Sequence, residues 1–350
     1  MLGPLSTWDG PWYLRIAAEG YAERQSAAFF PLYPLLIRFL SDVTGLSHRA
    51  AGVLISSLTF LGALILLHRL VGGQYGFTVA TRTTWLVALT PMGFFFSAVY
   101  TESLFLFLSL AAVVLAREGR WTLAALALLL ATLTRSAGVF VVVPMLFALI
   151  EQRGFNLRKL LKPGIQLAAG LAGPLVYAAH LERRWGDPLL MSSIQSEWTR
   201  AFSWPWMTLW TALDEVRIHF IVERAACTTQ IRDGQYGECL DRVGIGWNSL
   251  SDDLGVIYTG VAILLLIVAA RRLAPGDTMY ASLLLLFPLF KPTAFDQLVS
   301  VPRYMVVAWP LFVALAMLLE RRRLYIAALV ISAVLMCAFL VLHASSHFVA

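Results

Sequence analysis

The segment HRAAGVLISSLTFLGALILLH, residues 48–68, is apolar over the length that a helix needs to cross a bilayer, which is about 20 residues. Further apolar segments of similar or slightly shorter length follow it along the chain, at about 84–100, 103–117, 121–135, 137–150, 163–182, 254–270, 279–291, 304–319 and 324–343. The pattern predicts an all-α, polytopic helical membrane protein with about ten spans. Phe29–Leu40 is too short to span and carries two prolines near its start, so we expect a re-entrant or interfacial helix there.

The composition excludes a soluble globular protein. Of the 350 residues, 59% are hydrophobic and 14% are charged, and the mean hydropathy is +0.73. An ordinary soluble domain has about 25% charged residues. The formal net charge of +6 comes from short Arg and Lys clusters between apolar blocks, which is typical of membrane topology and gives no support for a nucleic-acid partner.

The basic residues predict the orientation of the spans, because short cytoplasmic connections are enriched in Lys and Arg. They gather in alternate connections, at Arg69 and Arg82, at Arg117 and Arg120, at Arg153, Arg158, Lys159 and Lys162, at Arg271 and Arg272, and at Arg321, Arg322 and Arg323. The complementary connections are then expected on the non-cytoplasmic side: residues 1–47, the turns at Glu102 and Arg135, residues 183–253 and residues 291–303. Residues 1–350 would thus form a single transmembrane domain with two large outer loops, 1–47 and 183–253.

The long outer loop, residues 183–253, is polar and rich in tryptophan, with Trp185, Trp198, Trp204, Trp206, Trp210 and Trp247. Tryptophan is common in helices that lie at the membrane interface, and it also stacks on sugars. Interfacial helices are the commoner explanation. The loop also contains Cys227 and Cys239, which could form a disulfide if this side is oxidising; the sequence leaves the pairing open.

The first outer loop contains Trp8-Asp9-Gly10-Pro11-Trp12. A carboxylate between two indole rings suits a base that handles a sugar, with Trp8 and Trp12 beside the substrate. The alternative is that Asp9 only caps a short helix that begins near Pro11, which is a common local arrangement. The local pattern does not decide between these two roles.

Three further charged residues are expected on the same side of the membrane, namely Glu102, Arg135 and Arg303, the last followed by Tyr304. Ionisable groups close to membrane spans are costly and are often functional. Two arginines could bind a lipid-linked phosphate and stabilise the charge that it gains on leaving, while a carboxylate accepts a proton. The alternatives are helix capping by Glu102 and snorkelling of Arg135 and Arg303 toward lipid headgroups.

Other chemistries find no sequence support. The sequence contains no Gly-rich phosphate loop, no His-Glu-x-x-His and no Cys-x-x-Cys, and its six histidines are scattered. We therefore expect no metal site and no cofactor.

A family resemblance rests on several motifs spread over most of the chain: Trp8-Asp9-Gly10, Ile16-Ala17, Gly20-Tyr21, Glu23, Ala28-Phe29-Phe30-Pro31-Leu32-Tyr33-Pro34, Phe96-Ser97-Ala98, Tyr100-Thr101-Glu102-Ser103-Leu104-Phe105, Thr134-Arg135-Ser136 with Gly138, Pro302-Arg303-Tyr304 and Trp309-Pro310. With these motifs the chain resembles the GPI mannosyltransferase II (PIG-V) family. The resemblance implies a GT-C glycosyltransferase fold and the use of a polyprenyl- or dolichyl-phosphate sugar, usually mannose, on the non-cytoplasmic side. Enzymes of that superfamily place an acidic residue in the first outer loop, and Asp9 matches that position.

The resemblance therefore favours catalysis over capping for Asp9. We expect an inverting mannosyltransferase, related to the enzymes of GPI-anchor biosynthesis, in which Asp9 deprotonates the acceptor. Arg303, with Arg135 as second choice, would bind the donor phosphate with help from Tyr304. Glu102 and Glu23 would orient sugar hydroxyls or support the arginines.

The acceptor is expected to be a glycolipid or a glycan. The membrane would be the plasma membrane in a prokaryote or that of the endoplasmic reticulum in a eukaryote, and membrane lipids would surround the spans. The family's first transmembrane helix is absent ahead of Trp8, so we expect that the sequence begins downstream of that helix. The chain is also short, with lean loops, which favours a prokaryotic relative. Two alternatives stay open: a transporter or flippase for a lipid-linked or anionic substrate, and a catalytically silent partner subunit of another glycosyltransferase.

Overall fold

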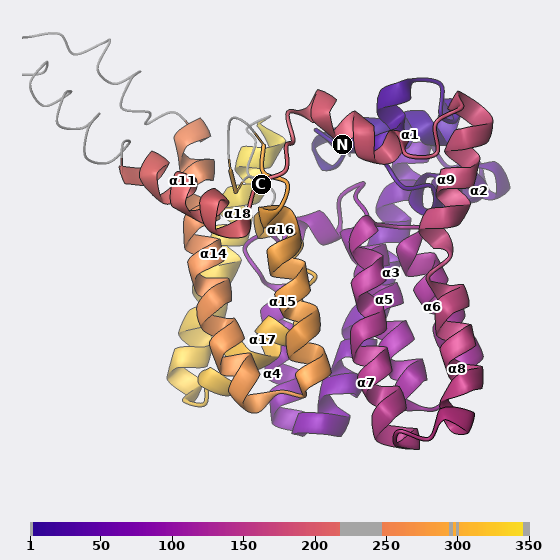
Figure 1. Cartoon of the computed structure of the whole chain (residues 1–350). Helices are drawn as coiled ribbons and strands as arrows, with labels where there is room; N and C mark the ends of the chain where they lie inside the picture. Colours follow the sequence, from indigo (N-terminus) through magenta and orange to yellow (C-terminus); the bar gives the residue numbers. More distant parts are fainter. Residues whose placement is uncertain (1–2, 218–246, 294–296, 299–300, 346–350) are drawn as a thin grey trace, which may run out of the picture.

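The computed structural model describes residues 3–217, 247–293, 297–298 and 301–345. This part of the chain is built from α-helices and 3₁₀-helices, and its one recorded β-bridge is an isolated pair between Arg200 and Thr293. Long helices run side by side as a bundle, and shorter helices cover one end of it (Figure 1). The expected all-α class is confirmed.

The chain up to Arg153 forms η1 (Gly3–Ser6), α1 (Gly10–Glu19), η2 (Arg24–Ala28), α2 (Leu32–Thr44), α3 (His48–Tyr75), α4 (Phe77–Ala88), η3 (Gly93–Phe96), α5 (Glu102–Arg117), α6 (Trp121–Thr132), η4 (Ser136–Val141) and α7 (Val142–Arg153). The rest forms α8 (Leu157–Gly170), α9 (Gly173–Trp185), α10 (Leu190–Ser193), η5 (Ile194–Trp198), α11 (Pro205–Arg217), α14 (Trp247–Arg272), α15 (Pro275–Leu289), α16 (Val301–Met305), α17 (Trp309–Leu318) and α18 (Arg322–Ala344).

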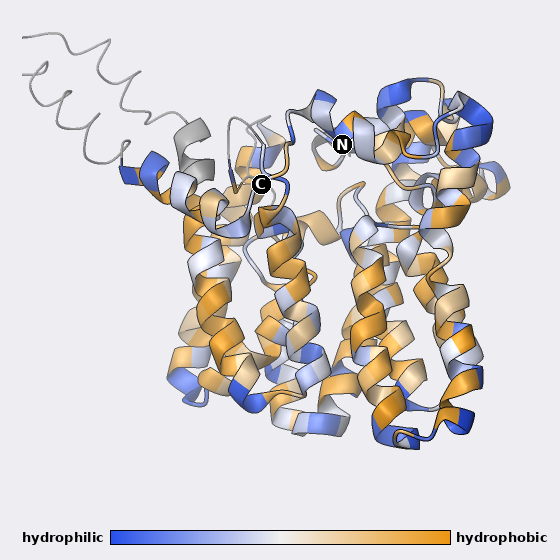
Figure 2. Cartoon of the chain, in the orientation of Figure 1, coloured by the Kyte–Doolittle hydropathy of each residue, from blue (hydrophilic) through white to orange (hydrophobic). Residues whose placement is uncertain are grey.

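Five described helical segments are long and apolar enough to cross a membrane: His48–Tyr75, Ser136–Arg153, Leu157–Trp185, Leu254–Arg272 and Arg322–Ala344. The other expected spans coincide with shorter helices, among them α6 and α17. The middle of the bundle is apolar, and polar residues gather at its two ends (Figure 2). The molecule is therefore an all-α membrane protein.

Proline accounts for the breaks in the spans expected over 84–100 and 304–319. The helix expected over 84–100 ends at Ala88, because Pro91 disfavours a helical conformation at the residue before it, and the chain continues as a turn and η3. The helix expected over 304–319 is divided into α16 and α17, with Pro310 in the first turn of α17. Both breaks lie at the same end of the bundle as α1 (Figure 1).

The segment expected at 163–182 is likewise two helices, α8 and α9, and Pro174 lies in the first turn of α9. The segment expected at Phe29–Leu40 begins as a helix only at Leu32, after Pro31, and continues to Thr44 as α2. Its position relative to a membrane stays a prediction.

Helix α5 lies at the centre of the first half of the chain and packs against α3, α6 and α7. Most of its side chains are buried, from Glu102 at its first position to Ala116 in its last turn. The start of α5 is therefore enclosed by protein at the end of the bundle that α1 covers (Figure 1).

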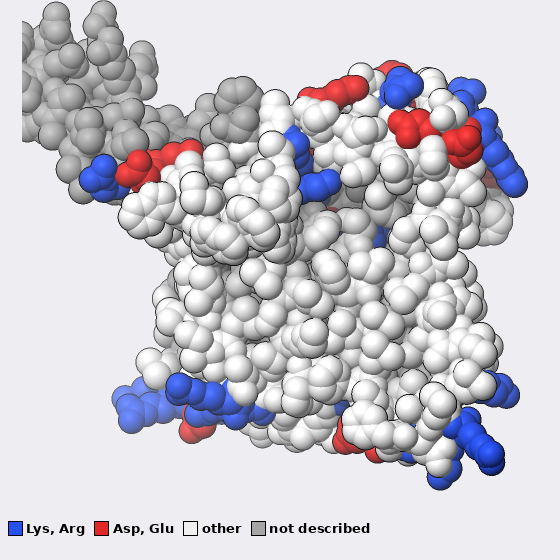
Figure 3. Space-filling view, in the orientation of Figure 1, with Lys and Arg blue, Asp and Glu red and all other residues white. Residues whose placement is uncertain are grey.

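Charged side chains occupy the two ends of the molecule and are sparse between them (Figure 3). The end that holds the start of α18 and the connection from α7 to α8 carries mainly Lys and Arg, as the alternating basic connections predict. Acidic side chains are more frequent at the other end. Which end faces the cytoplasm stays a prediction from the positive-inside rule.

The tryptophans of the long outer loop are described only in part. Trp204, Trp206 and Trp210 are exposed on or beside α11, and the first two stack with ring centroids 4.9 Å apart. Exposed rings suit both an interfacial helix and a sugar-stacking surface, so these alternatives stay open. Cys227 and Cys239, and the side chains of Trp198 and Trp247, lie outside the described part of the chain.

Candidate functional site

Asp9 occupies the N-cap position of α1, but its side chain makes no capping hydrogen bond. Trp8 directly before it has φ of 56°, a left-handed conformation that is uncommon for a residue other than glycine. The Asp9 carboxylate is turned to the other half of the chain, where its Oδ2 accepts a hydrogen bond of 2.7 Å from Nη1 of Arg303. The capping role is therefore wrong for the Asp9 side chain.

Glu102 joins the two predicted arginines. Its Oε1 accepts hydrogen bonds of 3.1 Å and 3.0 Å from Nε and Nη2 of Arg303, and it forms an ion pair of 2.7 Å with Nη1 of Arg135. Glu102 is fully buried, and the arginine side chains are each 12% exposed. Buried arginines paired with a carboxylate are not snorkelling residues, so the structure contradicts that alternative for both of them.

Arg303 therefore bridges two carboxylates that are 93 positions apart in the sequence and come from two different helix starts. The short helix α16 holds Arg303 and packs against α14 and α15. Arg135 lies in the turn between α6 and η4, in an extended backbone conformation. Four residues that the sequence placed on one side of the membrane thus form one connected cluster, which we call the Asp9–Arg303 cluster: Asp9, Glu102, Arg135 and Arg303.

Aromatic rings cover the two guanidinium groups. The ring of Tyr100 lies 4.7 Å from the Arg303 guanidinium carbon, and that of Phe95 lies 5.3 Å from it. Tyr304 lies 5.0 Å from the corresponding carbon of Arg135. Such contacts favour the cation and limit the access of water to both guanidinium groups. Tyr304 is thus placed beside Arg135, although it follows Arg303 in the sequence.

The cluster retains capacity for further polar contacts. Oε2 of Glu102 is buried and has no hydrogen-bond partner among the described residues. Asp9 is the most accessible member, with a side chain 30% exposed, and only its Oδ2 accepts a hydrogen bond from the described residues. A buried carboxylate oxygen without a donor is costly, and substrate hydroxyls could satisfy it.

Three predicted substrate-binding residues lie outside the ion-pair network. The Trp8 side chain is 43% exposed. Trp12 stacks on Phe29, with ring centroids 5.7 Å apart. Glu23 forms an exposed ion pair of 2.7 Å with Arg15 and not with the cluster arginines. Their roles toward a sugar stay predictions.

Sequence reasoning missed a group of residues around Asp9. The Tyr13 side chain lies near Asp9, Glu102 and Arg135, and burial together with the two carboxylates raises the pKa of its hydroxyl, which therefore stays protonated. No motif had pointed to Tyr13 as more than a neighbour of Asp9 in the first loop.

A second missed group holds the chain just before Asp9. The Tyr100 hydroxyl donates to the backbone oxygen of Thr7 over 2.9 Å, and the Thr7 hydroxyl lies 2.8 Å from Nε2 of His343. His343 comes from the last turn of α18, so the far end of the chain supports the turn that carries Asp9. Thr7 and His343 are 336 positions apart in the sequence, so no local sequence pattern could predict their contact.

The cluster combines two carboxylates with two arginines. Each carboxylate is paired with an arginine, and the described residues contain no group of three or more His, Cys, Asp or Glu that could hold a metal ion. Arginine commonly binds phosphate as well as carboxylate groups, so a phosphate could contact the same guanidinium groups as these carboxylates.

Comparison with known proteins places the chain. Residues 1–175, half of the chain, match the family model "Mannosyltransferase (PIG-V)". This region contains Asp9, Glu102 and Arg135 and ends before Arg303. No solved structure matches this chain.

Several curated proteins are similar to it. The GPI alpha-1,6-mannosyltransferase 2 of Cricetulus griseus is 36% identical over 44% of this chain and 33% of its own length. The human protein of the same name is 34% identical over 40% of this chain and 30% of its own length. The GPI mannosyltransferase 2 of Yarrowia lipolytica is 28% identical over 56% of this chain and 54% of its own length.

The chain thus spans between about a third and about half of the length of these relatives. The family match covers α1 and the helices up to α8, including the starts of α1 and α5 that carry the two carboxylates of the cluster. The chain belongs to the mannosyltransferase (PIG-V) family.

Proposed function

We propose that this protein is a membrane mannosyltransferase that moves mannose from a polyprenyl- or dolichyl-phosphate mannose to a hydroxyl group of a glycolipid. The names of its relatives support the sugar and the acceptor class, because they are GPI mannosyltransferases. The Asp9–Arg303 cluster supports a phosphate-linked donor, because its arginines suit an anionic leaving group.

The observation that carries the proposal is the bridge that Arg303 makes between Asp9 and Glu102. One guanidinium group thus contacts both a partly exposed carboxylate, that of Asp9, and a buried one, that of Glu102. A transferase needs both a base and a cation for the leaving phosphate in one site. In an inverting reaction these two groups act on opposite sides of the same sugar carbon, so the donor would have to separate Asp9 from Arg303 when it binds.

Donor, acceptor and these residues would react in a single displacement. The acceptor hydroxyl attacks C1 of the mannose and loses its proton to Asp9, while the bond between C1 and the phosphate oxygen breaks. The bonding electrons leave with the lipid phosphate, and Arg303 offsets the added negative charge. Attack opposite the phosphate inverts the configuration at C1, by analogy with inverting glycosidases. The phosphate leaves as an anion, so no general acid is needed.

The other members of the cluster would position these groups. Arg135 is held between Glu102 and the ring of Tyr304, so we assign it to orienting Glu102 and rank Arg303 first for contact with the phosphate. The free oxygen of Glu102 would accept a hydrogen bond from a sugar hydroxyl. Trp8, Trp12 and Glu23 would line the approach of the sugar or the acceptor from the first loop.

The cluster lies at the end of the bundle where Figure 1 shows α1 and α16. The basic connections lie at the opposite end (Figure 3). By the positive-inside rule, the end that holds the cluster faces away from the cytoplasm. We therefore propose one GT-C-like transmembrane domain over residues 1–350, with residues 1–47 and 183–253 on the outer side. It would lie in the plasma membrane of a prokaryote or in the endoplasmic reticulum membrane of a eukaryote.

A transporter or a silent subunit would not need a base beside the bridging arginine. The buried carboxylates of the described helices, Glu102 and Asp277, lie at opposite ends of the bundle and not along a path through it. This arrangement favours a transferase over the transporter hypothesis.

The test is transfer of labelled mannose from a short-chain polyprenyl-phosphate mannose to lipid acceptors in membranes that contain the full chain. Asp9→Asn keeps the shape and the hydrogen bond from Arg303 but removes the base, so we expect a rate loss of roughly 10²–10⁴-fold with nearly unchanged donor binding. Asp42→Asn is the matched control, because Asp42 is an exposed carboxylate of α2 whose partner is Arg38.

Equal loss in both variants, or full activity of Asp9→Asn, would contradict the role of Asp9 as base. If protein shown to be folded transferred no sugar from any lipid phosphate, the transferase proposal itself would fail, and the transporter or the silent subunit would replace it.

A further inference from the structure

The described part of the chain has a polar cavity of about 580 Å³ at the end of the bundle opposite the Asp9–Arg303 cluster. It lies where α6 begins, α7 ends and α8 begins. Five basic residues line it and no acidic residue does: Arg120, Arg153, Arg158, Lys159 and Lys162. The transferase proposal uses none of these residues.

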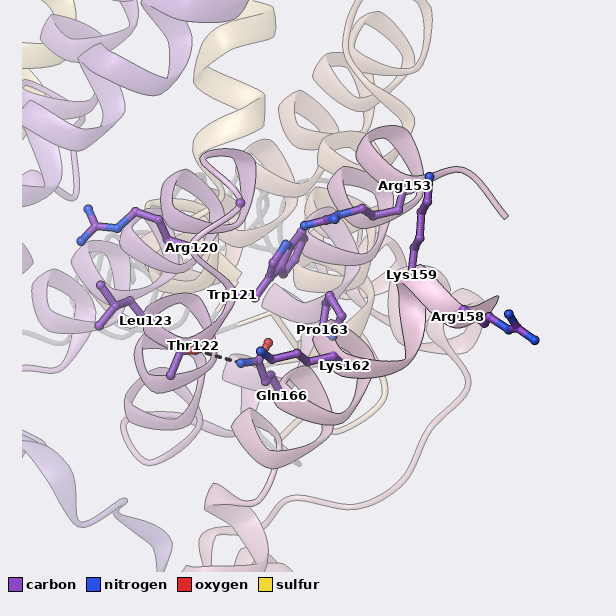
Figure 4. A pocket seen from close by; sticks show the side chains of 11 residues that line it. Arg120, Trp121, Thr122, Leu123, Arg153, Arg158, Lys159, Lys162, Pro163 and Gln166 are labelled. Carbon is purple, nitrogen blue, oxygen red and sulfur yellow. Dashed lines mark hydrogen bonds between the residues drawn. The ribbon is translucent and has the colours of Figure 1, made fainter. Parts of the chain in front are cut away.

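Most of the cations of this cavity lack a counter-charge within the described part of the protein. Arg120 has a weak contact of 3.8 Å with Glu118, but Arg153, Lys159 and Lys162 have no ion pair among the described residues. In Figure 4, the Arg153 side chain reaches across to Trp121, and Lys162 lies beside Gln166. Arg120 and Arg158 point away from them. Cations held together without an acid between them favour binding of an anion.

Neutral donors lie at the same place. Arg120, at the N-cap of α6, provides no side-chain cap, so the first N–H groups of this 12-residue helix point outward without partners from a capping side chain. Trp121 is only 5% exposed and lines the cavity, and its indole Nε1 has no hydrogen-bond partner among the described residues. A buried donor without a partner is costly, and a bound acceptor would satisfy it.

The surroundings of the cavity indicate what carries the anion. On α8, Leu157, Leu161 and Ile165 follow one another at intervals of four and are 78%, 60% and 62% exposed. They form an apolar stripe that begins beside the basic residues and runs along a segment apolar enough to cross a membrane. An acyl chain on this stripe would place its own headgroup next to the cavity.

We infer that this cavity binds the phosphate of an anionic phospholipid headgroup, with Arg153, Lys159 and Lys162 as its cations and the Trp121 indole as a neutral donor. Anionic lipids are recognised elsewhere by basic pockets at the ends of membrane helices. The bound lipid would link α6, α7 and α8 at the end of the bundle where short connections join them. This inference does not depend on the transferase proposal.

The experiment titrates the purified full chain in detergent with phosphatidylglycerol and with phosphatidylcholine of the same acyl chains, and native mass spectrometry counts the bound lipid. We expect phosphatidylglycerol to bind at least about tenfold more tightly. The double substitution Arg153→Gln/Lys162→Gln should weaken its binding roughly 30-fold, since each charge near an anionic lipid contributes about a factor of five.

The matched control is Arg322→Gln/Arg323→Gln, which removes the same charge from exposed residues at the same end of the molecule. It should change the binding less than about threefold. Trp121→Phe keeps the ring and all the charges and removes only the indole N–H, and it should weaken binding roughly fivefold.

The inference would be overturned if the two lipids bound equally, or if the control and the cavity substitutions had equal effects. It would also be overturned if phosphatidylglycerol binding were unchanged both in Trp121→Phe and in the separate variant Arg153→Gln/Lys162→Gln. Glycerol phosphate distinguishes the sources of the phosphate. If it displaced phosphatidylglycerol at the concentration at which the lipid itself binds, the cavity would be a site for soluble phosphates and not for a lipid.

Discussion

Glu102 is the residue on which both arginines of the candidate site depend. It is fully buried and its Oε1 contacts Arg135 and Arg303. A buried charge that loses its partner destabilises a protein by about 3–5 kcal/mol. An exposed pair such as Arg15–Glu23 contributes about 0–1 kcal/mol.

We therefore expect Glu102→Gln to lower the thermal stability of the detergent-solubilised protein by several degrees and Glu23→Gln to leave it nearly unchanged. Thermal unfolding followed by circular dichroism measures both. A similar small shift in the two variants would mean that Glu102 is not the anion that holds the arginines.

The two arginines should differ in their effect on the donor. Lysine keeps the charge but cannot bridge two carboxylates as the Arg303 guanidinium does. We expect Arg303→Lys to raise the KM for the lipid-phosphate donor at least about tenfold. Arg135→Lys should mainly lower stability, because Arg135 is packed between Glu102 and Tyr304. Donor-dependent kinetics and thermal unfolding of both variants test this. If Arg135 were the phosphate ligand, Arg135→Lys would raise the KM for the donor more than Arg303→Lys does.

The residues of the cluster could be named from the sequence because charged residues beside apolar segments are rare and need a reason. Their partners could not. Glu102 and Arg303 are 201 positions apart, and only the fold brings them together. Tyr13 and His343 escaped notice because buried tyrosine and histidine are ordinary in a chain with 11 tyrosines and 6 histidines. Their contribution is a matter of position, which no local pattern encodes.

At the scale of elements, the turn that carries Arg135 depends on close packing at Gly138. A Cβ there would lie 2.5 Å from the backbone oxygen of Ala131 and 2.7 Å from Cα of Thr132. Backbone atoms cannot move aside as a flexible side chain can, so η4 would have to shift away from α6, and Arg135 with it.

We expect Gly138→Ala to destabilise the protein by about 1–3 kcal/mol and to reduce mannose transfer. Gly164→Ala is the control, since Gly164 lies inside α8 and a methyl group added there would meet no described atom within 4 Å. That substitution should be neutral or stabilising, by about 0.5–1 kcal/mol. Thermal unfolding and transfer rates compare the two variants, and equal stability would show that η4 and α6 are not in close contact.

The helices themselves were predictable where apolar runs are long and unbroken, as in α3 and α18. Hydropathy does not show where such a run stops being helical. Pro91 and Pro310 lie inside apolar segments, and the helices are interrupted next to these prolines. These breaks put non-helical backbone beside the candidate site, where protein surrounds it, as a membrane protein requires.

At the scale of the whole molecule, the two ends of the bundle differ in chemistry. One end holds the Asp9–Arg303 cluster under the short helices α1 and α16, and the other holds basic connections and the cavity beside α8. An apolar middle separates them (Figure 2). The transferase proposal needs the end that holds the cluster to face away from the cytoplasm. The positive-inside rule predicts that the basic end faces the cytoplasm, which agrees with this need.

Labelling of introduced cysteines tests this orientation. Glu19→Cys lies in α1 at the end that holds the cluster, and Glu320→Cys lies between α17 and α18 at the basic end, and both positions are exposed. The background protein lacks Cys227, Cys239 and Cys337. We expect a membrane-impermeant maleimide to label Glu19→Cys in prokaryotic cells whose outer layers are permeable and whose cytoplasmic membrane is intact. Glu320→Cys should react only after the membrane is permeabilised, because Lys and Arg retain short connections in the cytoplasm. The opposite labelling pattern would place Asp9 on the cytoplasmic side, where the donor phosphate would have to approach from the other leaflet.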